Sequence, residues 1–347
     1  TRHGRRPGAL RRHPWRAAAV VVILAGICLI VGVFLWVREE ADPSGPLGRQ
    51  VVVDVAPNAD EGTVISTLAD RGVVGSSLAW RVWSQFNHLP SIQAGTYAFD
   101  KNSSFSRVRS VLEAGPNVFF FSIPAGFTVH EVAERVGQVP GFTEKGFDAL
   151  ATSGVVHSPW QPVGVTSLEG LLGTGNYRVV PGETQQALLV DMVDRFDELA
   201  DGEGLAAGSA RLGYTPYQVV TIASIVEKEG VIKENLGPVA RVIYNRLAAG
   251  MLLQMNSTVL YAEGRDGGPV TSTDLAKQTP YNTYLNPGLT PTPICFPSGP
   301  SLAAALNPPP GSWLYFVVVK ADGTEAFADT YAEQQANEAL ARQRGVP

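Results

Sequence analysis

The longest uninterrupted apolar stretch of the chain lies near its beginning. Residues 17–37 carry no charge over 21 positions, and a helix of this length spans roughly 30 Å, the thickness of a bilayer's hydrocarbon core. Trp15 and Trp36 flank the stretch, as interfacial aromatic residues do. The pattern predicts a transmembrane helix. The alternative is a cleaved signal peptide, whose apolar region is usually shorter, about 7–15 residues, and ends at small residues.

The charges around this stretch predict its orientation. Residues 1–16 contain six arginines and no acid. By the positive-inside rule this basic tail is cytoplasmic, and everything after the span lies on the outer face of the plasma membrane. We therefore expect a single-pass protein held in the lipid bilayer through 17–37. Residues 38–50 would form a polar linker with glycine and proline.

Short apolar segments then alternate with helical patterns. Residues 51–72 predict a strand, a turn and a helix. Residues 119–139 repeat this plan, with Thr128 as the N-cap and Glu131 at the capping-box position. A third unit of strand and helix lies between them. We interpret 51–140 as two or three small β–α modules.

A connecting region with helices is expected over 141–213, and the chain changes character after it. Thr215 as N-cap, a proline in the first turn and Gln218 three residues after the cap predict a helix start. Helices, loops and a strand follow, so 214–347 is expected to be a separate α+β domain, and the whole chain is α+β. The loop 279–301 is rich in Pro and Asn and is too long for a passive connection, since long loops are usually functional.

Composition narrows the possible functions. The 347 residues allow two or three ordered domains, with 45% apolar and 17% charged residues. The net charge of −5 argues against a nucleic-acid partner, because phosphate-binding surfaces need a basic excess. Cys28 lies inside the apolar stretch and Cys295 outside it, so we expect no disulfide between them. With five scattered histidines, we expect no metal site and no cofactor.

Two glutamates end the most apolar helix of the predicted domain. At about 100° per residue, Glu229 falls on the apolar stripe of this helix, whereas Glu227 points roughly 160° away from it. A carboxyl on the floor of a cleft has a raised pKa and can donate a proton near neutral pH. The alternative for Glu229 is a solvated helix end. The alternative for Glu227 is an exposed or structural position, paired with Arg241 or Arg246.

Neutral amides, hydroxyls and tyrosines dominate the segments around these glutamates. Such side chains suit a sugar, because hydroxyl groups pair with amides and sugar rings stack on aromatic faces. The segment "GRDGG" at 264–268 lacks the lysine of a P-loop and predicts a turn. The candidate supporting or substrate-binding residues are Glu227, Gln254, Asn256, Thr258, Tyr281, Asn282, Thr283, Tyr284, Asn245 and Glu169.

The segments "ASIVEKEG", "PYNTYLNPGL" and "PICFPSGPSLAAALNP" closely resemble the endolytic murein transglycosylase family, which is YceG-like. The resemblance covers the whole chain in architecture and implies a membrane anchor and LysM-like modules over 51–140. It implies lytic cleavage of nascent peptidoglycan glycan strands between N-acetylmuramic acid and N-acetylglucosamine, with 1,6-anhydro ends, and peptidoglycan synthases as candidate partners. Glu229 matches the family's essential glutamate. It would act first as general acid on the glycosidic oxygen and then as base on the 6-hydroxyl of muramic acid.

The chain departs from the family pattern at four places. Gly-Thr-Gly at 173–175 replaces Phe-Pro-Asp, and Asn256 replaces an aspartate. Glu325 stands where the family has histidine, and Ala-Glu-Gln-Gln at 332–335 replaces Glu-Glu-His-Asn. The "EKE" motif itself is intact.

Two other functions remain open at this point. One is a non-catalytic protein that binds or scaffolds cell-wall glycan. The other is a glycan hydrolase that uses water, for which a second carboxylate such as Glu169 or Glu234 should face Glu229.

Overall fold

A computed structural model of the protein describes residues 14–89 and 91–346, and most of the predicted basic tail therefore lies outside the described residues. The fold is α+β, as predicted. The chain divides into two compact units, Thr1–Val118 and Phe119–Pro347.

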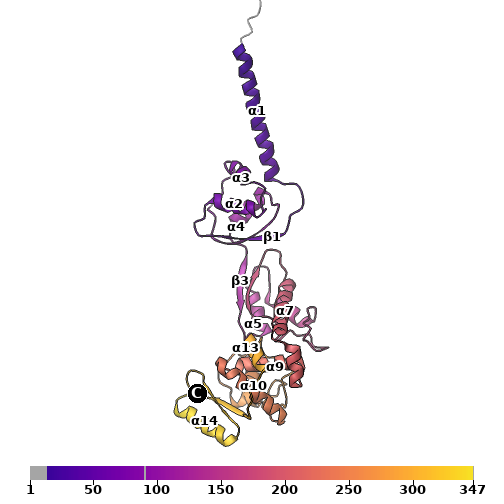
Figure 1. Ribbon diagram of the computed structural model, residues 1–347, viewed down its shortest axis with the longest axis vertical. Coiled ribbons are helices and arrows are strands. Elements are labelled where there is room, and N and C mark those ends of the chain that lie inside the picture. Colours follow the sequence, from indigo (N-terminus) through magenta and orange to yellow (C-terminus); the bar gives the residue numbers. More distant parts are fainter. Residues whose placement is uncertain (1–13, 90, 347) are drawn as a thin grey trace, which may run out of the picture. The chain divides into compact units, whose positions relative to one another are not determined.

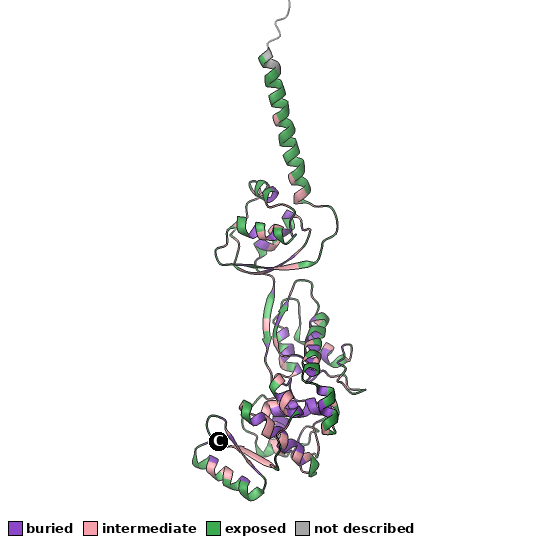
Figure 2. Ribbon diagram, viewed as in Figure 1, coloured by how far each residue is buried: buried purple, intermediate pink, exposed green. Residues whose placement is uncertain are grey.

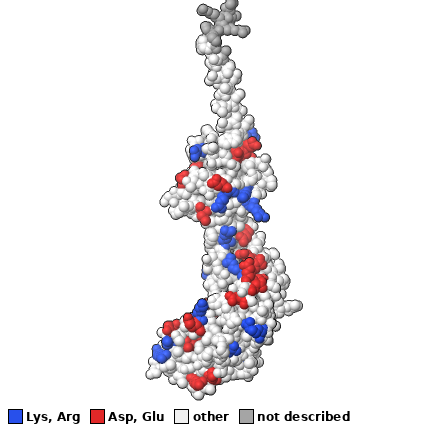
Figure 3. All heavy atoms as spheres, viewed as in Figure 1, with Lys and Arg blue, Asp and Glu red and all other residues white. Residues whose placement is uncertain are grey.

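The apolar stretch forms a single helix, α1 (Pro14–Ala41). Its segment Ala18–Ala41 is the one candidate membrane span among the described residues, and most of its residues are exposed (Figure 2). On the face that Figure 3 shows, the middle of this helix carries no charged side chain, in agreement with the uncharged sequence from Ala17 to Val37. The helix is long and apolar enough for an anchor, and a signal sequence shares these properties.

The rest of the first unit has a β–α–α–β order followed by one more helix (Figure 1). Strand β1 (Gln50–Val55) pairs antiparallel with β2 (Gly95–Asp100). The helices are α2 (Glu61–Asp70), α3 (Ser77–Ser84) and α4 (Phe105–Ala114). Trp80 packs on Phe105 with 5.1 Å between ring centroids, at the centre of the unit's core. Val37 and Ala41 of α1 pack against the same core, so the end of α1 belongs to this unit.

The second unit begins with another β–α–α–β order. Strand β3 (Phe119–Ile123) pairs antiparallel with β4 (Gly175–Val179). Between them lie α5 (Val129–Val136), which has the predicted capping box, and α6 (Glu144–Ser153). The division of the chain thus differs from the predicted boundaries at 140 and 213. The middle β–α segment completes the first unit, because β2 pairs with β1. The third one opens the second unit, because β3 pairs with a strand in the expected connecting region.

A small separate core forms around Val319, Ala341 and Val346, and the core of this second β–α–α–β part continues into most of the remaining elements. The remaining elements are α7 (Gln185–Gly202), α8 (Leu205–Leu212), α9 (Pro216–Glu229), α10 (Lys233–Ala248), α11 (Asn256–Ala262), α12 (Ser272–Leu275), α13 (Gly299–Leu306), β5 (Tyr315–Val318), β6 (Glu325–Ala328) and α14 (Tyr331–Gln343). Strands β5 and β6 form an antiparallel hairpin against which α14 packs.

Helix α9 is the centre of this unit. It begins with the predicted capping box between Thr215 and Gln218, and residues 219–226 are all buried. Helices α8, α10, α11 and α13 pack around it. Because every side of α9 is covered along this run, the position of its C-terminal end is fixed, and with it the position of the last two glutamates.

Candidate active site

A cavity of about 750 Å³ opens beside the C-terminal end of α9, a volume typical of small-molecule sites. Segments far apart in sequence form its walls. They are the start of α5, the loop before β4, the end of α9, α11 with the turn after it, and the loop at 279–281. Four residues predicted for the site line this cavity: Glu169, Glu229, Asn256 and Tyr281.

Glu229 is the last residue of α9, and its side chain is half-buried at the cavity wall. Its Oε1 accepts hydrogen bonds from the backbone N–H of Ser257 at 3.0 Å and from the Ser257 hydroxyl at 2.6 Å. Burial raises the pKa of Glu229 above its ordinary value, and the two donors of Ser257 oppose that rise. The carboxyl therefore combines a tendency to hold a proton with a fixed orientation.

Glu227 lies elsewhere, as helical geometry predicts. Its Oε2 accepts from the backbone N–H of Ser298 at 2.9 Å and from the Ser298 hydroxyl at 2.6 Å. Ser298 is the N-cap of α13, so Glu227 joins α9 to that helix. The alternative of a structural role was right in kind, but the pairing with Arg241 or Arg246 is wrong. Both arginines donate to backbone carbonyl groups instead.

Glu169 is a second carboxyl in the same cavity, with 5% of its surface exposed. The backbone N–H of Val129 lies 3.3 Å from both of its oxygens, and the Tyr261 hydroxyl donates to Oε2 at 3.1 Å. Burial raises the pKa of Glu169 to about 8, against the lowering effect of these donors. Glu169 is therefore mostly protonated at neutral pH, and it links the start of α5 to α11.

Aromatic and amide groups complete the walls near these carboxyls. The rings of Tyr261 and Tyr281 lie 4.9 Å apart between centroids, at an interplanar angle of 57°. The Tyr284 hydroxyl donates to the side-chain oxygen of Asn256 at 2.7 Å. Burial raises the pKa of Tyr284, and the charge of Glu229 adds to this rise.

The other predicted residues support the site from outside the cavity lining. Thr258 and Thr283 are buried and bond each other at 2.8 Å between hydroxyl oxygens. The amide of Asn282 donates to two backbone carbonyls of its own loop, and that of Asn245 donates to the loop before β5. Gln254 is exposed and holds a positive φ of 52°. These side chains shape the loops that carry Asn256, Tyr281 and Tyr284.

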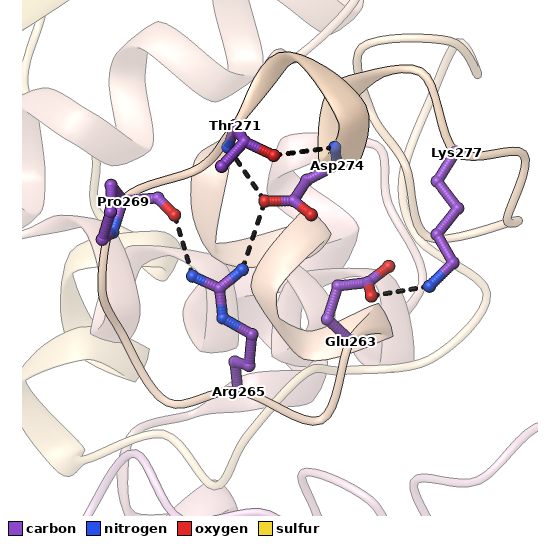
Figure 4. Close-up of polar contacts among 6 residues, drawn as sticks. All are labelled: Glu263, Arg265, Pro269, Thr271, Asp274 and Lys277. Carbon is purple, nitrogen blue, oxygen red and sulfur yellow. Dashed lines mark hydrogen bonds and ion pairs between the residues drawn. The ribbon is translucent and has the colours of Figure 1, made fainter.

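The predicted turn at 264–268 forms part of the cavity rim, a role that its sequence did not reveal. Figure 4 shows how the surrounding loop is held. The guanidinium of Arg265 bonds the carboxylate of Asp274 at 3.2 Å and the carbonyl of Pro269 at 2.8 Å. Lys277 forms an ion pair with Glu263 at 2.6 Å. The rim is therefore a fixed loop rather than an open glycine-rich strand.

Sequence reasoning missed Ser257 and Lys228. Ser257 stands between the predicted Asn256 and Thr258, and only its contact with Glu229, 28 positions away, gives it a role. Lys228 lines the cavity and forms an ion pair with Asp266 of the rim. Its place between two glutamates in "EKE" was visible, but its partner was not.

Glu325, one of the positions where a departure from the family pattern was expected, is buried at the start of β6. It is 8% exposed, and within the described residues neither of its carboxylate oxygens has a hydrogen-bond partner. The pKa of Glu325 is raised to about 8, mainly by burial and in part by the charge of Glu229. The backbone N–H of Val231 lowers the pKa of Glu325, although it does not form a hydrogen bond with the carboxylate. Asn235 holds the adjoining turn by donating to the carbonyl of Gly323 at 2.9 Å.

Comparison with known families assigns the chain. The model of the YceG-like family matches residues 53–339. The chain belongs to this family. The resemblance of its motifs is thereby confirmed over both units, from β1 to α14.

Relatives of this YceG-like protein carry a descriptive name. Endolytic murein transglycosylase from Streptococcus pneumoniae (strain D39 / NCTC 7466) is 28% identical over 320 residues, which cover 83% of this chain and 58% of that protein. The chain thus spans little more than half the length of that relative. Endolytic murein transglycosylase from Bacillus subtilis (strain 168) is 26% identical over 323 residues, which cover 88% of this chain and 89% of that protein.

A solved structure has the same fold. The crystal structure of a putative yceG-like protein from Listeria monocytogenes superposes with a TM-score of 0.57 at 24% sequence identity. The match covers 83% of this chain and 99% of that chain. At this identity the likeness shows the fold alone.

Proposed function

We propose that this YceG-like protein is a membrane-anchored endolytic lytic transglycosylase. It cleaves the bond between N-acetylmuramic acid and N-acetylglucosamine in nascent peptidoglycan strands and leaves 1,6-anhydro ends. The observation that carries the proposal is Glu229, a carboxyl at the wall of a cavity of about 750 Å³, oriented by Ser257 and with a pKa raised by burial. The name of the relatives, endolytic murein transglycosylase, supports the same reaction.

Glu229 acts twice in the proposed mechanism. In its protonated form it donates the proton to the glycosidic oxygen while the bond from that oxygen to C1 of muramic acid breaks. The resulting carboxylate then takes the proton of the 6-hydroxyl of the same sugar, and O6 bonds to C1. The proton returns to Glu229, so no water is consumed. Burial favours the acid form and Ser257 favours the carboxylate, and a group that must serve as both needs these opposed influences.

The other carboxyl of the cavity argues against the hydrolase alternative. In a hydrolase that uses Glu229 as the acid, the second carboxyl must be ionised to activate water or to attack the sugar. Glu169 has a pKa raised to about 8 and accepts hydrogen bonds from Val129 and Tyr261. Glu234, the other carboxylate considered, is exposed in the first turn of α10 and does not line the cavity. We assign Glu169 to the support of the cavity.

The proposal also covers the cavity walls, the membrane anchor and the β–α–α–β parts. Tyr261 and Tyr281 offer ring faces to a sugar, and Asn256 with Tyr284 offers polar groups to its hydroxyls. Helix α1 is retained as the anchor, with the second unit on the outer face of the plasma membrane. The two β–α–α–β parts are LysM-like modules that contact glycan strands, and peptidoglycan synthases are candidate partners.

Product analysis tests this function. The full chain, purified in detergent, is incubated with uncrosslinked glycan strands, and the products are identified by mass spectrometry. We expect anhydro-ended products from the wild type and from Glu234→Gln, an exposed control, and none from Glu229→Gln. Products with reducing ends would instead identify a hydrolase. Strand binding without cleavage by the wild type would identify a glycan-binding protein.

A further inference from the structure

Helix α3 of the first unit has an exposed apolar face. Leu78 and Val82 lie four residues apart on it, with 63% and 40% of their surface exposed. Phe86 follows four residues later, just past the helix end, and is 87% exposed. The opposite face is buried through Ala79 and Trp80 in the core of the unit. The helix is thus held by one face and presents apolar side chains on the other.

The neighbour of α3 is the end of α1. The two helices contact each other, and Figure 1 shows α3 beside the C-terminal end of α1. Val37 and Ala41 of α1 pack against the core that contains Trp80. The carboxylate of Glu40 lies so close to Gly75, which precedes α3, that even a Cβ atom there would come within 2.0 Å of its oxygen. This close approach fixes α3 to the last turn of α1.

The position of this contact along α1 sets the depth of α3. The uncharged stretch ends at residue 37, and Ala41 lies four residues further on, about 6 Å along the helix axis. The polar layer on each side of a bilayer is about 5–8 Å thick, from a hydrocarbon core of about 30 Å within a total of about 40–45 Å. If α1 crosses the bilayer, its contact with α3 falls within this layer, where apolar side chains can reach the acyl chains.

We propose that α3 docks on the bilayer that α1 crosses, with Leu78, Val82 and Phe86 inserted at the boundary between headgroups and acyl chains. The exposed Arg81 lies beside these residues, and its side chain can reach lipid phosphates while its stem stays in the apolar layer. The proposal rests on the membrane anchor of the proposed function and goes beyond it. The first unit is then attached to the membrane at two places, so it cannot turn freely about the end of α1.

Quenching of a fluorescent label by spin-labelled lipid tests the docking of α3 directly in the full chain. Single cysteines are introduced as Val82→Cys or Phe86→Cys in a background with Cys28→Ser and Cys295→Ala, and are labelled with an environment-sensitive fluorophore. The protein is reconstituted in vesicles of phosphatidylcholine and phosphatidylglycerol that contain spin-labelled lipid. Ile30→Cys in α1 is the membrane control. Asp54→Cys is the aqueous control, because it is exposed on β1, which Figure 1 draws on the side of the unit away from α1.

We expect the labels at 82 and 86 to be quenched several-fold more than the label at 54 and to approach the label at 30. Val82→Asp should reduce the quenching at 86, whereas Ser66→Asp on the exposed side of α2 should not. Quenching at 30 with no excess at 82 and 86 would overturn the docking and leave the anchor intact. Absence of quenching at 30 would refute the anchor and the docking together. A label at 86 that neither lipid nor aqueous iodide quenches would show that a protein covers the face, which also overturns the proposal.

Discussion

Two regions of the second unit contain the same pair of hydrogen bonds between a serine and a glutamate, but the two pairs have different roles. Glu227 accepts the backbone N–H and the hydroxyl of Ser298 at 2.9 and 2.6 Å, and Glu229 accepts those of Ser257 at 3.0 and 2.6 Å. Ser298 caps α13, whereas Ser257 lies at the wall of the cavity. The comparison teaches that the hydrogen-bond pattern alone does not mark a catalytic carboxyl. Of these two glutamates, Glu229 lines the cavity and Glu227 does not.

The largest expected effect is the difference in kcat between substitutions of Glu229 and of Glu227. Loss of a general acid costs about 10²–10⁴-fold in rate, so Glu229→Gln should lower kcat by this factor while the protein stays folded. Glu227→Gln should keep its kcat once allowance is made for the folded fraction. Turnover of glycan strands and the circular dichroism of both variants check this. Equal losses of kcat in two well-folded variants would remove the distinction.

The next effect concerns the buried carboxyl of Glu325 in β6. The pKa of Glu325 is raised from 4.5 to about 8 in the folded protein, so the folded state binds its proton more tightly than the unfolded state does. Its contribution to stability is therefore complete below about pH 4.5 and is lost as the pH rises toward 8. The slope is at most about 1.4 kcal/mol per pH unit for one group. Urea unfolding between pH 5 and 8 should show a weaker pH dependence for Glu325→Gln, and the exposed control Glu234→Gln should follow the wild type.

A smaller effect, on the free energy of unfolding, is expected from the first of two serine substitutions. Ser298→Ala removes an N-cap hydroxyl, and such a loss costs about 0.5–2 kcal/mol in the free energy of unfolding. It should leave the pH profile of activity unchanged. Denaturant melts of Ser298→Ala and of the wild type measure the cost, and an unchanged midpoint would show that the cap does not hold α13.

The smallest effect is expected from the matching substitution of Ser257 at the cavity wall, in the pH profile of activity. The hydroxyl of Ser257 lowers the pKa of Glu229, so Ser257→Ala should raise that pKa and move the alkaline limb of kcat/KM to higher pH. The conservative variant Ser257→Thr keeps a hydroxyl and should restore the wild-type limb. A limb that stays in place in Ser257→Ala would mean that it reports another group.

The sequence predicts the directions of the two glutamates better than it predicts their serine partners. The capping box of Thr215 and Gln218 sets the start of α9, and helical geometry then sends Glu229 and Glu227 in different directions, as the structure has them. These features are local, within four residues or within one helix. The serine partners are not local, since Ser257 and Ser298 lie 28 and 71 positions from their glutamates.

The same reason explains the other differences. The pairing of β3 with β4 joins segments on either side of the predicted boundary at 140, and hydrophobic periodicity does not reveal which strands pair. Amide and hydroxyl side chains were expected near Glu229, and Asn256 lines the same cavity as this glutamate. Their division into those that line the cavity, such as Asn256, and those that hold loops, such as Asn282, depends on burial that a single sequence does not show.

The central claim is that Glu229 removes the proton from the 6-hydroxyl of the sugar. This oxygen, and not a water molecule, then bonds to C1. Digestion of glycan strands in water enriched in heavy oxygen, followed by mass spectrometry of the new muramic acid ends, tests it most directly. The account predicts anhydro ends without heavy oxygen, formed by the wild type and lost in Glu229→Gln. Heavy oxygen at C1 of the new ends, formed directly by the enzyme, would contradict it.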